Sequence, residues 1–157
     1  MVVEIPKGSR NKYEVDHATG DLWLDRTLFT ATQYPADYGF VPDTLAEDGD
    51  PLDVLVLLDE PTFPGCHVMV RPIGVFRMRD EAGGDDKVLA VPAKDPRYAG
   101  LRDLGDVRTL LPFLLDEIEH FFAVYKEVEP GKDTEPGHWE DAAAAVRIVA
   151  ESRSRFA

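Results

Sequence analysis

This 157-residue chain lacks several sequence features, and their absence excludes some classes of protein. Its one cysteine, Cys66, excludes an internal disulfide and leaves no partner thiols for a zinc site, which fits a reducing compartment. No window approaches the roughly 18 consecutive apolar residues of a membrane-spanning helix. The first ten residues, MVVEIPKGSR, lack the charged and then apolar pattern of a signal peptide. We therefore expect a cytoplasmic protein with no membrane contact.

Positive charge is also scarce. The chain has 17 lysines and arginines against 30 aspartates and glutamates, a formal net charge of -13 at pH 7. Nucleic-acid binding depends chiefly on attraction between cationic side chains and the phosphate backbone. The charge balance therefore argues against nucleic acid and anionic membranes as partners. It suits a protein that recruits metal cations, although many other soluble proteins are equally acidic.

The length predicts one domain, residues 1–157, large enough to bury a core without disulfides. Residues 12–16 and 21–25 predict a hairpin that turns at Gly20. Further strands are expected over 53–58, over 66–80 with a kink at Pro72 and Gly74, and over 87–92. Apolar residues at helical spacing predict one helix from Leu111 to Tyr125 and a second over about 139–155. The expected architecture is mainly β with α, a small closed barrel carrying two C-terminal helices.

The segment DGDPLD, residues 48–53, places three carboxylates directly before the apolar run VLVLL. A solvated acidic loop is the ordinary interpretation of any one of these aspartates. Together they favour a hard-cation site, because Pro51 stiffens the loop and oxygen ligands are those that Mg²⁺ prefers. An EF-hand does not fit, since its sixth position requires glycine and is Asp53, and its twelfth requires glutamate and is Asp59.

A second acidic cluster comprises Asp80, Glu81, Asp85 and Asp86 in a glycine-containing loop. Taken alone, it is better interpreted as a polar turn. However, Asp80 ends one expected strand and Asp85 precedes the next, so both side chains can face the same opening. Sequence spacing does not decide whether Asp53 faces that opening too.

Cationic and phenolic residues accompany these carboxylates. Lys12 and Glu14 lie on one face of their strand, because side chains alternate along a strand. Some of the others have simpler explanations, such as core packing for Tyr125 or a favourable helix dipole for Lys126. Aspartates mixed with lysine, arginine and tyrosine suit a polyanion that binds together with metal ions. The candidates for this second group are Lys12, Arg26, Tyr34, Tyr38, Tyr125 and Lys126.

Several segments, in their order, resemble the soluble family I inorganic pyrophosphatases of the bacterial branch. They are EIPKGSRNKYEVD, VDHATG with LDR, YPADYGF, DGDPLDVLV, RPIGVFRMRDEAGGDDK and HFFAVYKEVEPGK. The resemblance extends from about Val3 to Trp139. DGDPLDVLV is close to the family's D-G-D-P-x-D-[ILV]-x-V-x-V signature, which is a specific motif.

The resemblance implies a five-stranded OB-type barrel, assembly as a homohexamer, and Mg²⁺-dependent hydrolysis of pyrophosphate to two phosphates by a metal-activated water. It implies that Asp50 helps to deprotonate this water and that Asp53 and Asp85 also serve catalysis. Direct metal ligands would be Asp48, Asp53, Asp80 and Asp85, with Glu4 and Glu14 nearby and reaching metal through water. Substrate contacts would come from Lys12, Arg26, Tyr38, Lys87, Tyr125 and Lys126, supported by Tyr34.

Two other classes of function agree less well with the sequence. A non-catalytic metal- or phosphate-binding module of OB type would be expected to have lost at least one of the aspartates or Lys12, Arg26 and Tyr38, and all are present. An OB-type oligonucleotide binder would need a basic groove with exposed aromatic residues, which the acidic balance opposes.

Overall fold

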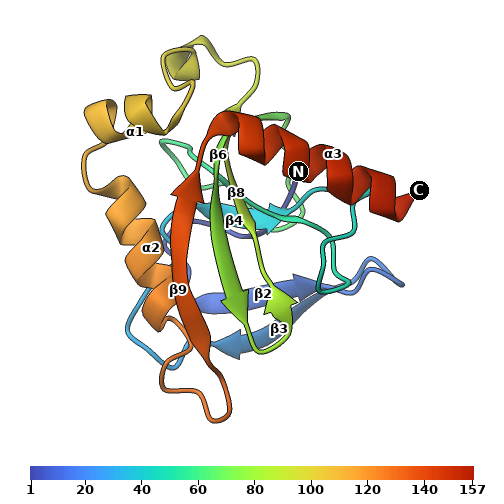
Figure 1. Ribbon diagram of the computed structural model, residues 1–157. Helices are drawn as coiled ribbons and strands as arrows, with labels where there is room; N and C mark the ends of the chain where they lie inside the picture. The colour runs from blue at the N-terminus through green and yellow to red at the C-terminus, as the bar shows by residue number, and fades with distance from the viewer.

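The computed structural model describes residues 1–157 as a β-rich body with most of its helix in the last third (Figure 1). The strands are β1 (Val2–Ile5), β2 (Asn11–Val15), β3 (Leu22–Thr27), β4 (Asp37–Phe40), β5 (Asp53–Val56), β6 (Val70–Asp80), β7 (Gly83–Gly84), β8 (Lys87–Pro92) and β9 (Thr134–Glu140). The helices are the 3-10 turn η1 (Pro96–Tyr98), α1 (Leu104–Leu110), α2 (Leu114–Val124) and α3 (Ala142–Phe156). None of them combines the length and the hydrophobicity needed to cross a bilayer.

Seven strands form one sheet in the order β1-β4-β5-β8-β6-β7, with β9 on the other side of β6, while β2 and β3 form a separate pair. All pairs are antiparallel except β5 and β8. In that parallel pair Asp53 lies opposite Lys87. The first residue of each strand therefore brings a carboxylate beside an ammonium at the same end of the sheet.

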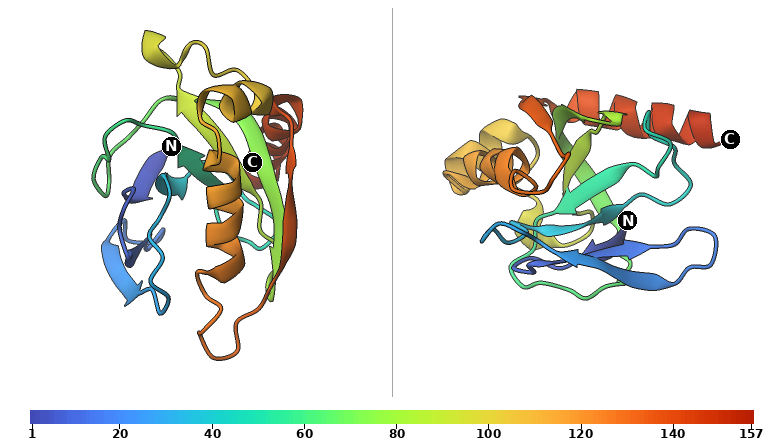
Figure 2. Two further views of the ribbon diagram at one scale, coloured as in Figure 1. Left: turned by 90° about the vertical axis from the view of Figure 1, so that its left-hand side faces the viewer. Right: turned by 90° about the horizontal axis from the view of Figure 1, so that it is seen from below.

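Helices pack against both faces of the sheet (Figure 2). The side chains of a strand alternate between two apolar clusters, one on each face. On β5, Leu55 joins the larger apolar cluster, which contains residues of α1 and α2. Its neighbour Val54 joins the smaller cluster, which contains Ala145 and Ile148 of α3. Successive side chains of a strand point to opposite faces, so a strand buried on both sides is apolar throughout. This explains the uninterrupted run VLVLL after DGDPLD.

The expected hairpin is confirmed as β2 and β3, with Gly20 in the left-handed conformation at the turn (φ +78°). The strand expected over 87–92 is also confirmed, and the long strand shifts register between Pro72 and Gly74, where a kink was expected. The second expected helix begins later than predicted. Residues 139 and 140 are still paired with β6, and the Asp141 carboxylate caps α3 by accepting from the Ala144 N–H at 2.8 Å.

The strand and helix counts differ from the expectation. The sequence did not predict β1, β4, the short β7, β9 or α1, so two C-terminal helices become three α-helices in all. The hydrogen-bonded strand order runs from one end to the other without returning to its start, and the two-stranded sheet stays separate. The protein is mainly β with three helices, and these pairings do not confirm the closed five-stranded barrel.

Candidate active site

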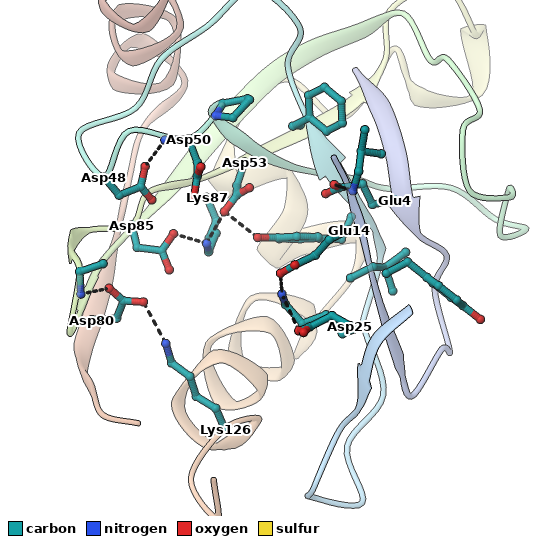
Figure 3. Close-up of a pocket in the computed structure, with 18 of the residues that line it drawn as sticks. Glu4, Glu14, Asp25, Asp48, Asp50, Asp53, Asp80, Asp85, Lys87 and Lys126 are labelled. Atoms are coloured by element: carbon teal, nitrogen blue, oxygen red, sulfur yellow. Dashed lines mark hydrogen bonds and ion pairs between the residues drawn. The ribbon is translucent and has the colours of Figure 1, made fainter. Parts of the chain in front are cut away.

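A polar cavity of about 520 Å³ lies at the end of the sheet where β5 and β8 begin (Figure 3). It brings together both acidic segments, so Asp53 and Asp80 line the same space. Thirteen of the fourteen predicted site residues line it: Glu4, Lys12, Glu14, Arg26, Tyr38, Asp48, Asp50, Asp53, Asp80, Asp85, Lys87, Tyr125 and Lys126. The exception is Tyr34.

These side chains come from segments spread between residues 4 and 126 of the chain. The loop before β5 supplies Asp48 and Asp50, while Asp53 and Lys87 stand at the first positions of β5 and β8. Asp80 is the last residue of β6, and the tight β6–β7 turn returns the chain to Asp85 beside it. The remaining residues come from β1, from β2 and β3, from β4, and from the end of α2.

Lys87 occupies the centre of the acidic cluster. Its Nζ donates to both Asp53 and Asp85, and the Tyr38 hydroxyl donates to Asp53 Oδ2 at 2.6 Å. Burial raises the pKa of Asp53 and alone would lower that of Lys87, but the two carboxylates raise the pKa of Lys87 well above its usual value. The ammonium therefore keeps its proton and serves as the internal counter-ion of this cluster.

Lys126 has the same role for the second acidic segment. Its Nζ donates to Asp80 Oδ2 at 2.9 Å and to Glu81 Oε2 at 3.3 Å. Partial burial opposes ionisation of Asp80, yet the bonds from Lys126 and from the Ala82 N–H lower its pKa below the usual range. Lys132 donates to the other oxygen of Glu81 at 3.0 Å. Asp80 is therefore held as a carboxylate.

The third group of charges lies on the β2–β3 pair. Lys12 contacts Glu14 and also Asp25, whose Oδ2 lies 3.3 Å from Nζ. Arg26 contacts Asp25 through Nη1, and its Nε lies 2.6 Å from Oε1 of the buried Glu129. Every cationic side chain of the cavity thus has a carboxylate partner, and the cavity combines cation ligands with groups that bind oxyanions.

The chain is similar to known proteins over its whole length. The model of the inorganic pyrophosphatase family matches residues 1–157. The chain belongs to the inorganic pyrophosphatase family. An inorganic pyrophosphatase of Streptomyces coelicolor is 60% identical over 156 residues, which cover 99% of this chain and 94% of the relative.

Solved pyrophosphatases have the same fold. The crystal structure of the inorganic pyrophosphatase of Thermus thermophilus matches with a TM-score of 0.93 at 48% identity, over 99% of this chain and 89% of that one. An N-terminally truncated vacuolar soluble pyrophosphatase of Trypanosoma cruzi, solved in complex with PPi, matches with a TM-score of 0.87 at 26% identity. That match covers 99% of this chain and 67% of the other.

Besides Asp53, two further carboxyl groups of the cavity have a raised pKa. Burial raises the pKa of Glu4 to about 7, although Oε1 of Glu4 accepts from the Val15 N–H at 2.9 Å, which opposes the shift. The negative charge of Asp53 adds to the rise. Burial likewise raises the pKa of Asp48, which accepts from the Asp50 N–H at 3.0 Å. Both groups would be more easily ionised beside an added positive charge.

The donor set of the cavity fits a hard divalent cation. As the structure stands, no group of three carboxylate, thiol or imidazole side chains is arranged to hold a metal ion. Lys87 and Lys126 engage three of the predicted ligands, Asp53, Asp85 and Asp80. The available ligands are carboxylate oxygens with no thiolate among them, and oxygen ligands are those that Mg²⁺ prefers. Burial raises the pKa of Asp48 and Asp53, and a bound cation would oppose this shift by stabilising both carboxylates.

Tyr34 is the predicted residue that the cavity does not include. It is buried, and its ring packs 4.7 Å from the Phe121 centroid and 5.4 Å from that of Tyr38. Tyr34 thus packs against the ring of Tyr38. The hydrogen-bonding role expected of Tyr34 stays a prediction.

Four charged or imidazole side chains that were not among the predicted site residues also line the cavity. They are His17, Asp25, Glu81 and Lys132. Two of them carried a signal in the sequence. Asp25 directly precedes Arg26, and Glu81 belongs to the second acidic cluster. His17 and Lys132 lie inside the quoted family segments or beside them, but nothing in their spacing singled them out.

Proposed function

We propose that residues 1–157 act as one domain that hydrolyses inorganic pyrophosphate to two phosphates with Mg²⁺ as cofactor. The observation that carries this proposal is the meeting, in one cavity, of the carboxylates of both acidic segments with lysine, arginine and tyrosine side chains. The Trypanosoma cruzi relative was solved with PPi, which supports the same substrate here.

The cationic side chains are proposed to bind the substrate. Pyrophosphate carries several negative charges, and guanidinium and ammonium groups stabilise phosphoryl oxygens by charge-assisted hydrogen bonds. Because these groups pair with carboxylates of the cavity, substrate binding would exchange one set of anionic partners for another. The proposed contacts are Lys12, Arg26, Tyr38, Lys87, Tyr125 and Lys126.

The carboxylates are proposed to hold Mg²⁺. Asp48, Asp53, Asp80 and Asp85 would bind it directly, and Glu4 and Glu14 through water. When bound, the cation supplies charge neutralisation and lowers the pKa of a water ligand.

Asp50 is proposed to accept the proton of the attacking water. The side chain of Asp50 lies on the rim of the cavity, and its carboxylate makes no hydrogen bond, so both oxygens are available as acceptors. The water oxygen then bonds to one phosphorus as the bridging P–O bond breaks, and no covalent enzyme intermediate is required. Lysine, arginine and tyrosine groups stabilise the charge that moves onto the leaving phosphate.

Release of phosphate from pyrophosphate tests this function. The wild type is expected to be active with Mg²⁺ and inactive with EDTA, and Asp50→Asn is expected to lower kcat by about 10²- to 10⁴-fold, the usual contribution of general base catalysis. Asp21→Asn is the matched control, because Asp21 is exposed and lies outside the cavity. A wild type without metal-dependent turnover would instead favour the non-catalytic metal- or phosphate-binding module. An Asp50→Asn enzyme as fast as wild type would remove only the proposed base.

We propose, finally, that the chain assembles as a homohexamer, as the resemblance implies. Support comes from large apolar side chains left exposed on one chain, including Trp23 (63% exposed) and Phe113 (80% exposed). The OB-type description of the strands and a cytoplasmic location also stay predictions. So does the expectation that neither nucleic acid nor membrane is a partner.

A further inference from the structure

Glu129 is a buried carboxylate that stands behind the cavity wall. It lies in the turn after α2, its side chain is only 6% exposed, and it does not line the cavity. Its two oxygens meet two nitrogens of one guanidinium. Oε1 lies 2.6 Å from Nε of Arg26, and Oε2 accepts from Nη2 at 3.2 Å. Only the Nη2 contact is a hydrogen bond, because the Nε–Oε1 pair lacks hydrogen-bond geometry and is an ion-pair contact. One charge-assisted hydrogen bond and a second close contact between opposite charges together hold the guanidinium in position.

Arg26 is the only partner of Glu129 in an ion pair, and it does line the cavity. The guanidinium is held on both sides, by Glu129 on the buried side and by Asp25 on the cavity side. An arginine side chain has many rotamers when it is free, so a buried partner decides which of its nitrogens remain for a ligand.

Glu129 also lies close in sequence to two residues that line the cavity. It follows Tyr125 and Lys126 by four and three residues, and the Glu129 N–H donates to the Lys126 carbonyl at 3.0 Å. The same turn therefore presents two proposed phosphoryl ligands and holds a third, Arg26, which comes from β3, 103 residues earlier. The separate β2–β3 pair is thereby aligned with the end of α2 across the cavity.

We propose that Glu129 is a positioning residue for pyrophosphate hydrolysis, holding the Arg26 guanidinium in the orientation that meets a phosphoryl oxygen. This inference rests on the proposed function. The competing explanation is an ion pair that only joins β3 to the α2–β9 connection, which would affect stability and leave substrate binding unchanged.

The first test replaces Glu129 by glutamine, which keeps its size and removes its charge. Glu129→Gln is expected to lower kcat/KM by about 10- to 100-fold, because a displaced binding group costs this much even at a distance from the reacting atoms. Glu127→Gln is the matched control, since Glu127 lies in the same turn, is exposed and makes no ion pair. It should retain wild-type kinetics.

A double-mutant cycle then separates positioning from stability. In an Arg26→Gln background, Glu129→Gln should change kcat/KM by less than about twofold, because the group it acts through is already gone. The two single variants should also share one pattern of changes in kcat and KM. Equal losses in both backgrounds, or a lower Tm with wild-type kcat/KM, would overturn the proposal. If Glu129→Gln does not fold, Glu129→Asp is used instead. It keeps the negative charge on a shorter side chain and is expected to lose less kcat/KM than predicted for Glu129→Gln.

A binding measurement that does not depend on turnover tests the role of Glu129 separately from the proposed function. Calorimetric titration with inorganic phosphate in Mg²⁺ should show weaker binding to Glu129→Gln and to Arg26→Gln by similar factors, and unchanged binding to Glu127→Gln. Unchanged phosphate affinity of Glu129→Gln, with weakened affinity of Arg26→Gln, would overturn the positioning role even for a fully active enzyme. If the wild type does not hydrolyse pyrophosphate, the proposed function fails, and this titration still tests whether Glu129 acts through Arg26.

Discussion

Glu4 on β1 makes a pH-dependent contribution to stability that follows from its burial. The pKa of its carboxyl is about 7 in the folded protein against 4.5 for an unperturbed glutamate. Between these two values the folded state keeps a proton that the unfolded chain has released. The metal-free protein should therefore lose stability as the pH rises from about 4.5 through about 7, by roughly 3 kcal/mol from this group.

Urea unfolding in EDTA at pH 5, 6, 7 and 8 measures this contribution. Glu4→Gln retains an oxygen that accepts the Val15 N–H but cannot ionise. Its free energy of unfolding should rise relative to wild type as the pH increases, with most of the change complete by pH 8. If the free energy of unfolding changed with pH in the same way for both proteins, Glu4 would have the same pKa in the folded and unfolded states, contrary to this prediction.

At the residue scale, the sequence predicted the identity of most cavity residues but not their pairing. Thirteen of fourteen candidates line one space because they belong to family segments with a specific signature. Glu129 was missed, although it lies in a quoted segment, because its partner Arg26 is 103 residues away and no local pattern connects the two. The central position of Lys87 was equally hidden, since it depends on the parallel register of β5 and β8.

At the scale of elements, local patterns predicted the hairpin, β5, β8 and α2, whereas strands defined by distant partners were missed. The last strand, β9, shows why. It contains Pro136 and Gly137, which disfavour strands, and it is a strand only because it pairs with β6. Gly137 is required there for a steric reason, because an added Cβ would lie 2.7 Å from the Arg77 carbonyl oxygen and 2.4 Å from Cζ of Phe76.

Gly137→Ala is therefore expected to destabilise the fold by about 1–3 kcal/mol, the usual cost of overpacking. The Phe76 ring is buried against Phe122 and Trp139, and the Arg77 carbonyl belongs to the β6 backbone and can move only with the strand. Gly100→Ala is the matched control, because the nearest atom to its added Cβ would be a leucine methyl 4.0 Å away. Chemical denaturation should show a loss for Gly137→Ala alone, and equal stability of the two variants would mean that β9 tolerates a side chain at this position.

At the scale of the whole molecule, the cavity concentrates negative charge on a chain that already carries a net charge of -13. Its carboxylates come from segments far apart in sequence, the loop before β5, the end of β6 and the approach to β8. Lysines neutralise only some of these groups, and burial still raises the pKa of Asp48 and Asp53. A cation that binds the folded cavity and not the unfolded chain must therefore stabilise the entire fold.

Millimolar Mg²⁺ is expected to raise Tm by about 5–10 °C if its concentration exceeds Kd roughly a hundredfold, since that ratio contributes about 2.7 kcal/mol. General screening of the acidic surface would also raise Tm, so the comparison is made against NaCl at equal ionic strength. The extra effect of Mg²⁺ should be reduced in Asp48→Asn, which changes a cavity carboxylate, and preserved in the exposed variant Asp21→Asn. If Mg²⁺ and NaCl shift Tm equally while turnover still requires Mg²⁺, the cation binds too weakly to hold these segments together, and its role is confined to the reaction.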